Sequence, residues 1–241
     1  MACYWRDPGG DRRGSGLPTR RLGPQRRWAT ALILIALLGF ALVLLLVRYR
    51  SPIALDLRVT RGLQRLENPA LSAVLVAVTW LGWQPQQTLI AAVPLGLFFL
   101  TRRRVEGTFL VLALAIGALN DLLKLAIRRP RPSAALDDIL VHGHVLGTSF
   151  PSGHVLTYVL FYGFLAYVTY TQVRRPLLRW GLLLPMLVLL ALIGPSRVYL
   201  GHHWFTDTVA SYLLGGALLI GLLLAYRSVR GRRVVPVPGP G

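Results

Sequence analysis

Long apolar blocks separated by short polar segments dominate the chain. Residues 28–47 form twenty consecutive positions without a charge. Twenty helical residues span about 30 Å, the thickness of the hydrocarbon core of a bilayer. Further apolar blocks follow at 71–83, 88–101, 107–127, 155–171, 180–194 and 208–226. This pattern predicts an all-α, polytopic membrane helix bundle and excludes an ordinary soluble domain as the leading interpretation.

The arginines indicate which blocks cross the membrane. The block at 71–83 is short and follows a mixed stretch at 51–69. If it does not cross, both termini lie on one side, and that side carries 17 of the 26 arginines. If it crosses, the arginine-rich tails lie on opposite sides, against the positive-inside rule. We therefore expect six transmembrane helices plus a short interfacial or re-entrant helix at 71–83, although two short spans forming a hairpin remain an alternative.

This topology divides the chain into a disordered basic cytoplasmic tail (1–27), a six-helix transmembrane domain (28–227) and a second cytoplasmic tail (228–241). The first block runs directly into Arg48, which favours a retained anchor over a cleaved signal peptide. The net charge is +18. Because the basic residues flank apolar blocks, topology explains this charge better than binding to nucleic acid, and we expect no nucleic-acid partner.

Three polar clusters are predicted to face the non-cytoplasmic side, and the first surrounds the only lysine of the chain, Lys124. This lysine lies near the end of an apolar block, where a charge needs a partner, and Asp121 is one turn away. Prolines then end the helix, so that the loop can bring Arg131 back toward Lys124. For Arg128 and Arg129 we expect only a positive flank that anchors the helix end.

The second cluster is Phe-Pro-Ser-Gly-His at 150–154, directly before an apolar helix. Ser152 occupies the expected N-cap position, and the N–H groups of a first helical turn bind phosphate well. Gly153 allows an anion to approach the backbone closely, and His154 can carry a proton near neutral pH. An ordinary capped helix with an interfacial histidine is an equally good interpretation of this cluster alone.

The third cluster contains Arg197, His202, His203 and Asp207. His203 and Asp207 are four residues apart, so a helix places them on one face. The carboxylate can then accept from one ring nitrogen and leave the other free as a nucleophile. Arg197 can bind a phosphate through two parallel hydrogen bonds. His202 has no clear assignment, and we take it as a loop residue.

No metal site or cofactor site is predicted. Potential ligands gather in one loop, but their spacing matches no zinc signature; they are Asp137, Asp138, His142 and His144. We expect these four residues to be solvated. Glu106, Asn120 and Asp121 are interpreted as helix-packing or ion-pair residues.

Taken together, the clusters resemble the three motifs of the phosphatidic acid phosphatase type 2 superfamily: Lys-x6-Arg-Pro, Pro-Ser-Gly-His and Ser-Arg-x5-His-x3-Asp. The resemblance implies that His203 attacks phosphorus to form a phosphohistidine, that Asp207 orients His203, and that His154 transfers protons. It also implies that the phosphoryl oxygens are held without a metal or other cofactor by Lys124, Arg131, Ser152, Gly153 and Arg197. The N-terminal tail and residues 51–69 lie outside the resemblance.

The expected activity is hydrolysis of a lipid phosphate or diphosphate at the non-cytoplasmic membrane surface, with membrane lipids as the other partners. Undecaprenyl diphosphate, phosphatidic acid and phosphatidylglycerophosphate are candidate substrates, and an outward site in a bacterial plasma membrane slightly favours the first. A lipid phosphotransferase that uses the same histidine is an alternative. So is a non-enzymatic transporter or scaffold, which predicts Lys124, His154 and His203 far apart. The oligomeric state is left open.

Overall fold

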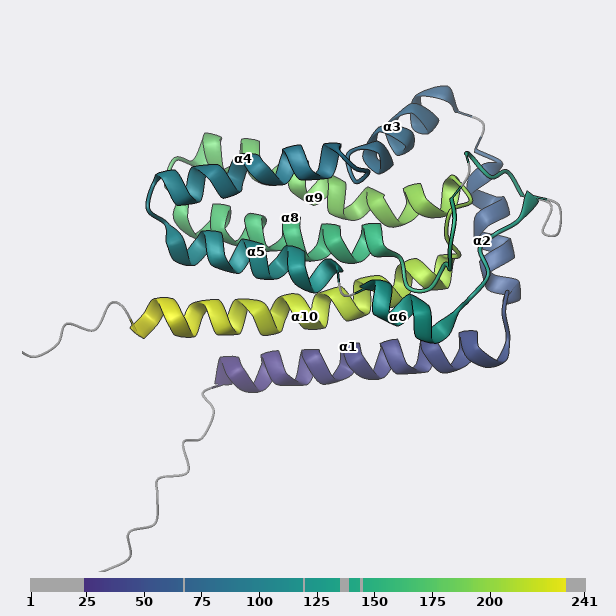
Figure 1. The fold of residues 1–241 in the computed structure, drawn as a ribbon, viewed down its shortest axis with the longest axis horizontal. Coiled ribbons are helices and arrows are strands. Elements are labelled where there is room, and N and C mark those ends of the chain that lie inside the picture. Colours follow the sequence, from purple (N-terminus) through teal and green to yellow (C-terminus); the bar gives the residue numbers. More distant parts are fainter. Residues whose placement is uncertain (1–23, 67, 119, 135–138, 144, 233–241) are drawn as a thin grey trace, which may run out of the picture.

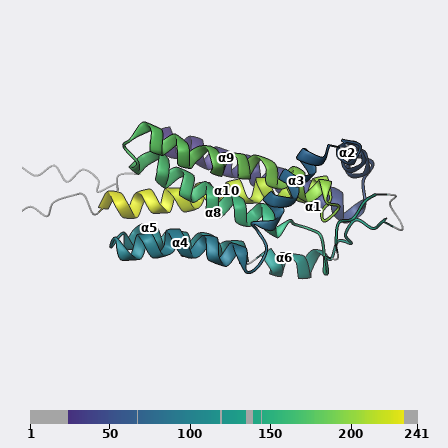
Figure 2. The same ribbon diagram turned by 90° about the horizontal axis from the view of Figure 1, so that it is seen from above.

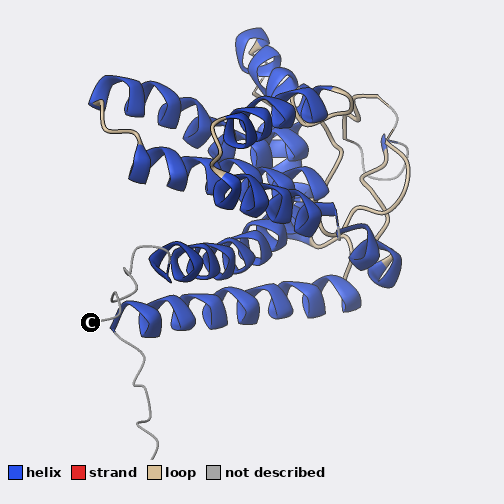
Figure 3. Ribbon diagram, turned by 60° about the vertical axis from the view of Figure 1, so that its left-hand side comes forward, coloured by secondary structure: helices blue, strands red, loops and turns tan. Residues whose placement is uncertain are grey.

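A computed structural model of the chain describes residues 24–66, 68–118, 120–134, 139–143 and 145–232. Every regular element within these residues is a helix (Figure 3), which confirms the all-α prediction. The helices are α1 (Pro24–Tyr49), α2 (Ala54–Gln64), α3 (Pro69–Trp80), α4 (Gln86–Leu100), α5 (Arg104–Ala118), α6 (Asn120–Ile127), α8 (Gly153–Gln172), α9 (Pro176–Tyr199) and α10 (Phe205–Arg232).

Six of these helices, α1, α4, α5, α8, α9 and α10, run side by side along the long axis of the molecule (Figure 1). The beginning of α1 and the end of α10 lie at the same end of this bundle. At the opposite end, α2 lies across the bundle, and α6 follows α5 (Figures 1 and 2). This opposite end is called the loop end below.

Helix α8 forms the centre of the bundle and contacts α5, α9 and α10. Most of its side chains are buried, among them Phe164 and Leu160, neither of which is exposed at all. Phe164 packs against Phe109 of α5 and against Tyr226 of α10. Because α8 is covered by protein on several sides, its first turn is held firmly at the loop end of the bundle.

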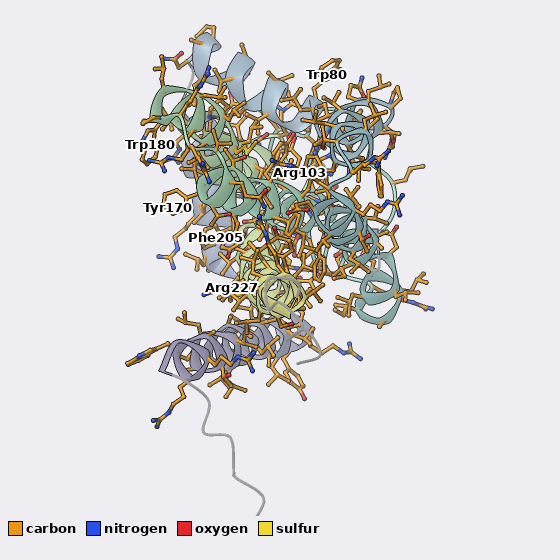
Figure 4. All side chains as sticks on the ribbon, turned by 90° about the vertical axis from the view of Figure 1, so that its left-hand side faces the viewer. Trp80, Arg103, Tyr170, Trp180, Phe205 and Arg227 are labelled. Carbon is orange, nitrogen blue, oxygen red and sulfur yellow. The ribbon has the colours of Figure 1, made fainter. Side chains whose placement is uncertain are left out.

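Four helical stretches are long and apolar enough to cross a membrane: Arg26–Tyr49, Arg104–Ile127, Pro176–Tyr199 and Phe205–Gly231. Large apolar side chains are exposed along them, as on α1, where Leu34 is 61% and Leu38 63% exposed. The aromatic side chains of Trp80, Tyr170 and Trp180 are also exposed, at the outer edge of the bundle (Figure 4). Apolar surfaces of this kind are stable in lipid rather than in water, so the chain is an integral membrane protein.

The block predicted not to cross, 71–83, contains α3, which is inclined to the long axis (Figure 1). Asn68 caps this helix, because its Oδ1 accepts from the N–H groups of Ala70 and Leu71. Near the other end, the Ser196 hydroxyl on α9 bonds both the Leu75 carbonyl and the Thr79 hydroxyl at 2.5 Å. These contacts attach α3 to the end of α9 and thereby place the α3–α4 connection at the loop end.

Two predicted boundaries differ from the structure. Helix α1 already begins at Pro24, and α10 extends to Arg232, so both predicted tails contribute a short helical extension to the bundle. Pro24 is the first residue of α1, where proline is well tolerated, and Gly231 is the second-last residue of α10, where it does not interrupt the helix. Residues 1–23 and 233–241, the rest of the predicted tails, lie outside the described residues.

Candidate active site

Side chains from all three sequence clusters meet in one cavity of about 370 Å³ at the loop end. Its charged and titratable lining consists of Lys124, Arg131, His154, Arg197 and His203, together with the backbone of Gly153. The other two predicted site residues, Ser152 and Asp207, are fully buried next to this lining. The alternative hypothesis of a transporter or scaffold predicted that Lys124, His154 and His203 lie far apart, and this prediction is wrong.

His203 lies in the turn between α9 and α10, and its neighbours determine which ring nitrogen carries the proton. Its Nδ1 is 2.7 Å from the Ser149 carbonyl oxygen, which can only accept. Its Nε2 is 3.3 Å from the NH1 group of Arg131, which can only donate. Both contacts are satisfied when Nδ1 carries the hydrogen and Nε2 presents its lone pair, so the lone pair is on the nitrogen next to Arg131.

The surroundings of His203 also keep its ring neutral. Burial holds the pKa of His203 well below its usual range, and the charges of Arg197, Arg131 and Lys124 act in the same direction. The Ser149 carbonyl favours the protonated ring and opposes this shift only in part. At neutral pH the ring is therefore an unprotonated base, which is the state that a nucleophile requires.

Asp207, at the start of α10, lies farther from His203 than the sequence spacing predicts. Its Oδ2 is 3.6 Å from the His203 Nδ1 atom, beyond hydrogen-bond distance. The same oxygen accepts from the Trp204 N–H at 2.9 Å, and Oδ1 accepts from the Arg129 NH1 group at 2.5 Å. The carboxylate thus faces the ring as a nearby negative charge, while the Ser149 carbonyl holds the ring hydrogen.

The prediction that Arg129 is only a positive flank is wrong. Its side chain is 3% exposed and bridges Asp207 and Asp56 of α2, whose Oδ2 atom lies 2.6 Å from the Arg129 NH2 group. Asp56 also accepts from the N–H and the hydroxyl of Thr206, both at 2.9 Å. A buried guanidinium needs such partners. One signal in the sequence was available, because Asp56 is an acidic residue within an otherwise apolar and basic stretch.

The cations of the cavity differ in how far they are already paired. Lys124 pairs with Asp121 at 3.1 Å, which confirms the expected partner. Arg131 donates to the carbonyls of His202 and Gly147. Arg197 is 1% exposed, yet among the described residues its Nε and NH1 atoms have no hydrogen-bond partner. A buried guanidinium with unpaired N–H groups is stabilised when an anion binds to it.

The first turn of α8 presents further unpaired groups to this region. Ser152 is the N-cap of α8, as predicted, but its hydroxyl makes no capping bond. That hydroxyl and the Nε2 atom of His154 are both buried, and neither has a partner in the described part of the chain. A Cβ atom on Gly153 would lie 3.0 Å from the Asn120 Nδ2 atom, so only glycine keeps this backbone open.

His202 is also more than the loop residue that the sequence suggested. It is 2% exposed, and its Nε2 atom lies 2.5 Å from the His142 carbonyl oxygen. Burial, followed by the charge of Arg197, lowers the pKa of His202 to about 4, although the His142 carbonyl acts in the opposite direction. The described residues contain no group of metal ligands. Three of the four potential ligands considered in the sequence, Asp137, Asp138 and His144, lie outside the described residues.

The connection between α3 and α4 closes one side of the cavity, and the motifs gave no sign of it. Gly82, Trp83, Gln84 and Gln87 line the cavity from this side. Gly82 packs so tightly on His154 that a Cβ atom would lie 2.7 Å from the Cδ2 atom of that ring. The Gly-Trp pair at the end of the apolar block 71–83 was the available signal in the sequence.

A second cavity of about 520 Å³ adjoins the first between α4, α5, α6 and α8. The two cavities share the lining residues Gln84, Gln87, Gly153 and Thr157. Asn120, which we expected to pack between helices, borders the second cavity with both side-chain polar atoms buried and unpartnered among the described residues. The rest of its lining is mainly small or apolar, with Asp121 the one charged residue.

Comparisons with known proteins identify the class. The sequence model of the PAP2 superfamily matches residues 106–231, more than half of the chain. The chain therefore belongs to the PAP2 superfamily and is a phosphatase of that family. It is 32% identical over 165 residues to phosphatidylglycerophosphatase B of Bacillus subtilis (strain 168), an alignment that covers 66% of this chain and 77% of the relative.

Two solved structures share the fold. The crystal structure of a transmembrane PAP2-type phosphatidylglycerolphosphate phosphatase from Bacillus subtilis matches with a TM-score of 0.68 and 24% identity, over 83% of this chain and 96% of the other. The crystal structure of Aquifex aeolicus LpxE matches with a TM-score of 0.55 and 22% identity, over 73% of this chain and 97% of the other.

Proposed function

We propose that the chain is a membrane lipid phosphatase that hydrolyses a lipid phosphate through a phosphohistidine on His203. The observation that carries this proposal is the state of the His203 ring. Its Nε2 lone pair lies beside Arg131 at a cavity that also contains Arg197 and Lys124. A neutral nucleophile beside several cations suits attack on an anionic phosphate, where catalysis depends on positioning and on charge stabilisation.

In the first step the His203 Nε2 atom attacks phosphorus, and the bond between phosphorus and the lipid oxygen breaks. His154 donates a proton to that oxygen, which leaves as the lipid alcohol. In the second step His154 takes a proton from a water molecule that attacks the phosphohistidine, and the bond between phosphorus and nitrogen breaks. Free phosphate and neutral His203 result, so each group returns to its starting state.

The remaining predicted site residues hold the phosphoryl oxygens in this proposal. Arg197, Arg131 and Lys124 supply positive charge, and Ser152 and the Gly153 N–H supply hydrogen-bond donors. The buried, unpaired atoms of Arg197 and Ser152 support this assignment, because a bound phosphate would satisfy them. Asp207 stabilises the positive charge that develops on the ring of His203.

The neighbouring cavity favours a lipid with one phosphate. The side chains of Lys124, Arg131 and Arg197 border the first cavity. The polar side chains at the second cavity include the amides of Gln84, Gln87 and Asn120 and the carboxylate of Asp121. A second phosphate there would meet an acidic residue and no cation, while glycerol oxygens could bond Asn120, Gln84 and Gln87. We therefore propose a phosphatidylglycerophosphate-like monoester, the substrate named for the Bacillus subtilis relative, ahead of undecaprenyl diphosphate.

We also propose that α1, α4, α5, α8, α9 and α10 are six spans, with both termini cytoplasmic and the cavity on the other side of a bacterial plasma membrane. The arginine-rich ends of α1 and α10 lie together, opposite the loop end, which supports this topology. A fifteen-residue α4 is about 22 Å long, so it crosses only where the bilayer thins or where its ends are extended.

The test is phosphate release by the purified chain in detergent from matched monophosphate and diphosphate lipids. We expect faster release from the monophosphate, and a loss of about 10⁴-fold or more in His203→Ala with its melting temperature retained. Activity that survives in His203→Ala contradicts the covalent mechanism. Transfer of phosphate to another lipid, without free phosphate, identifies a phosphotransferase instead, and preferred release from the diphosphate contradicts the substrate proposal.

A further inference from the structure

Behind His203 lies a buried cluster of two carboxylates and one guanidinium, which we call the Asp56–Arg129–Asp207 cluster. Arg129 bonds Asp207 through NH1 at 2.5 Å and Asp56 through NH2 at 2.6 Å. Both carboxylates are fully buried, and Arg129 is 3% exposed. The Nε atom of Arg129 donates to the Ser51 hydroxyl at 2.8 Å, so the guanidinium is fixed by partners from two distant parts of the chain.

The charges of this cluster matter for His203 because the three groups do not cancel. Arg129 alone would neutralise Asp207, and no net negative charge would then face the ring. Asp56 supplies the second carboxylate, which leaves the cluster with a net charge of −1. A charge in a buried site interacts strongly over several ångströms, so this excess stabilises a positive imidazole ring.

We propose that Asp56 and Arg129 are positioning residues of the phosphatase, which hold Asp207 behind His203 and set the negative charge that the ring experiences. This inference rests on the proposed function, because it assumes that His203 is the nucleophile. Neither residue borders the cavity, so neither contacts the substrate. Helix α2, which lies outside the three motifs, thereby acquires a function in the reaction.

The contacts of Thr206 support a positioning role. Thr206 lies between Phe205 and Asp207 in the first turn of α10, and both its N–H and its hydroxyl donate to Asp56. The Arg129 NH1 group also donates to the Thr206 hydroxyl at 2.8 Å. Asp56 therefore anchors the beginning of α10 at the residue before Asp207, and a shift of α2 would move that carboxylate relative to the ring.

Other charged or titratable groups also face His203 from the surrounding elements. Lys124 lies on α6, and Arg131 lies in the loop after it. His154 lies on α8, and Arg197 lies near the end of α9. His202 lies in the α9–α10 turn, and Asp207 lies at the start of α10. From the α3–α4 connection, only uncharged residues line the cavity. None of these side chains is itself replaced in the Asp56 and Arg129 variants, so a change in the titration of His203 measures the charge of the cluster and the position that it gives to Asp207.

The experiment compares the pH dependence of kcat/KM in Asp56→Asn and Arg129→Gln, measured as phosphate release from the monophosphate lipid. The acid limb of kcat/KM reports the group of the free enzyme that must be unprotonated, which here is His203. Asp56→Asn removes a negative charge, so the limb should move to lower pH. Arg129→Gln removes a positive charge, so the limb should move to higher pH, each by about one pH unit.

Matched controls separate this effect from damage to the fold. Arg128→Gln changes the exposed arginine next to Arg129, and Glu106→Gln changes a buried carboxylate at the other end of the bundle. Neither control should move the acid limb. Arg129→Lys keeps the positive charge but replaces the planar guanidinium, whose two NH groups reach both carboxylates. It should therefore lower kcat, while the acid limb of kcat/KM stays close to that of the unmodified chain.

Opposite shifts in the two variants support the proposal, whereas shifts in the same direction, or lower activity with an unmoved limb, overturn it. If Arg129→Gln does not fold, Asp56→Asn is compared with the double variant Asp56→Asn/Arg129→Gln, in which the limb should return upward by about one pH unit. An unmoved limb in that comparison also overturns the proposal. If the unmodified chain releases no phosphate, the proposed function fails; if it does and only these shifts are absent, this inference alone fails.

Discussion

The two ends of the helix bundle each contain a buried polar network, and the networks differ in how completely they are paired. At the end where α5, α8 and α10 meet, the Glu106 Oε1 atom accepts from the Tyr226 hydroxyl at 2.9 Å and from the Gln172 Nε2 atom at 3.0 Å. The Arg230 NH1 group lies 3.6 Å from the same oxygen. None of these groups is among the buried atoms without a partner.

The loop end is different. There the Ser152 hydroxyl, the His154 Nε2 atom, the Asn120 amide and two nitrogens of Arg197 are buried without a partner in the described part of the chain. Leaving such groups unpaired costs about 1–3 kcal/mol each, and more for a charged group. A protein tolerates this cost where a ligand completes the bonds, which distinguishes a binding site from a structural network.

Among the tests of this contrast between the two ends, the largest expected effect concerns Arg197. In Arg197→Met we expect kcat/KM for the monophosphate lipid to fall by about 10²–10³-fold, because a donor to the phosphoryl oxygens is lost. The melting temperature should stay the same or rise, since the substitution removes a buried guanidinium whose Nε and NH1 atoms have no partner in the described residues. Phosphate-release assays and thermal unfolding in detergent measure the two quantities.

Arg179→Met on the same helix is the matched control, because Arg179 packs on Tyr170 away from the cavity. Its activity should stay within twofold of the unmodified chain. A large fall in the melting temperature of Arg197→Met, together with retained activity, would show that Arg197 is a structural residue and that the contrast between the two ends does not hold.

Glu106→Gln should produce the reverse result at the other end of the bundle. This substitution breaks a paired network, so we expect a loss of about 1–3 kcal/mol in the free energy of unfolding. Activity per folded molecule should stay within twofold, because Glu106 does not border either cavity. Chemical unfolding followed by tryptophan fluorescence gives the stability, and a tenfold loss of kcat without unfolding is the outcome that contradicts this prediction.

The smallest effect is the dependence of stability on pH. His202 and His203 are buried as neutral rings, with the pKa of His202 lowered to about 4 and that of His203 well below its usual range. In the unfolded chain both bind protons near pH 6.5. The unfolded state therefore takes up protons first as the pH falls, and the stability present above about pH 6.5 is lost progressively toward pH 4.

Each of the two histidines contributes roughly 1 kcal/mol of lost stability per pH unit in that range. Melting temperatures measured from pH 8 to pH 4 should therefore fall on acidification. In His203→Gln the fall should be shallower, since one titrating ring is removed. Equal slopes in the two proteins would mean that His203 is protonated in the folded state and would contradict the neutral nucleophile.

Much of the fold could be predicted from local patterns. The apolar blocks predicted the helices of the bundle, because an uncharged run of this length is stable as a helix in lipid. Ser152 was recognised as an N-cap, and Asp121 as the partner of Lys124, because both features depend on residues within one helical turn. The convergence of the three clusters followed from the side of the membrane assigned to each.

The sequence by itself thus determined the long apolar helices, the candidate site residues and the family of the protein, because each depends on spacing along the chain. Only the tertiary structure decided the long-range partners of those side chains. The Ser149 carbonyl, rather than Asp207, holds the ring of His203 from 54 residues away, and Asp56 reaches Arg129 across 73 residues. Such pairs form when packing brings distant backbone and side-chain groups into a space without water, and no local spacing encodes that geometry.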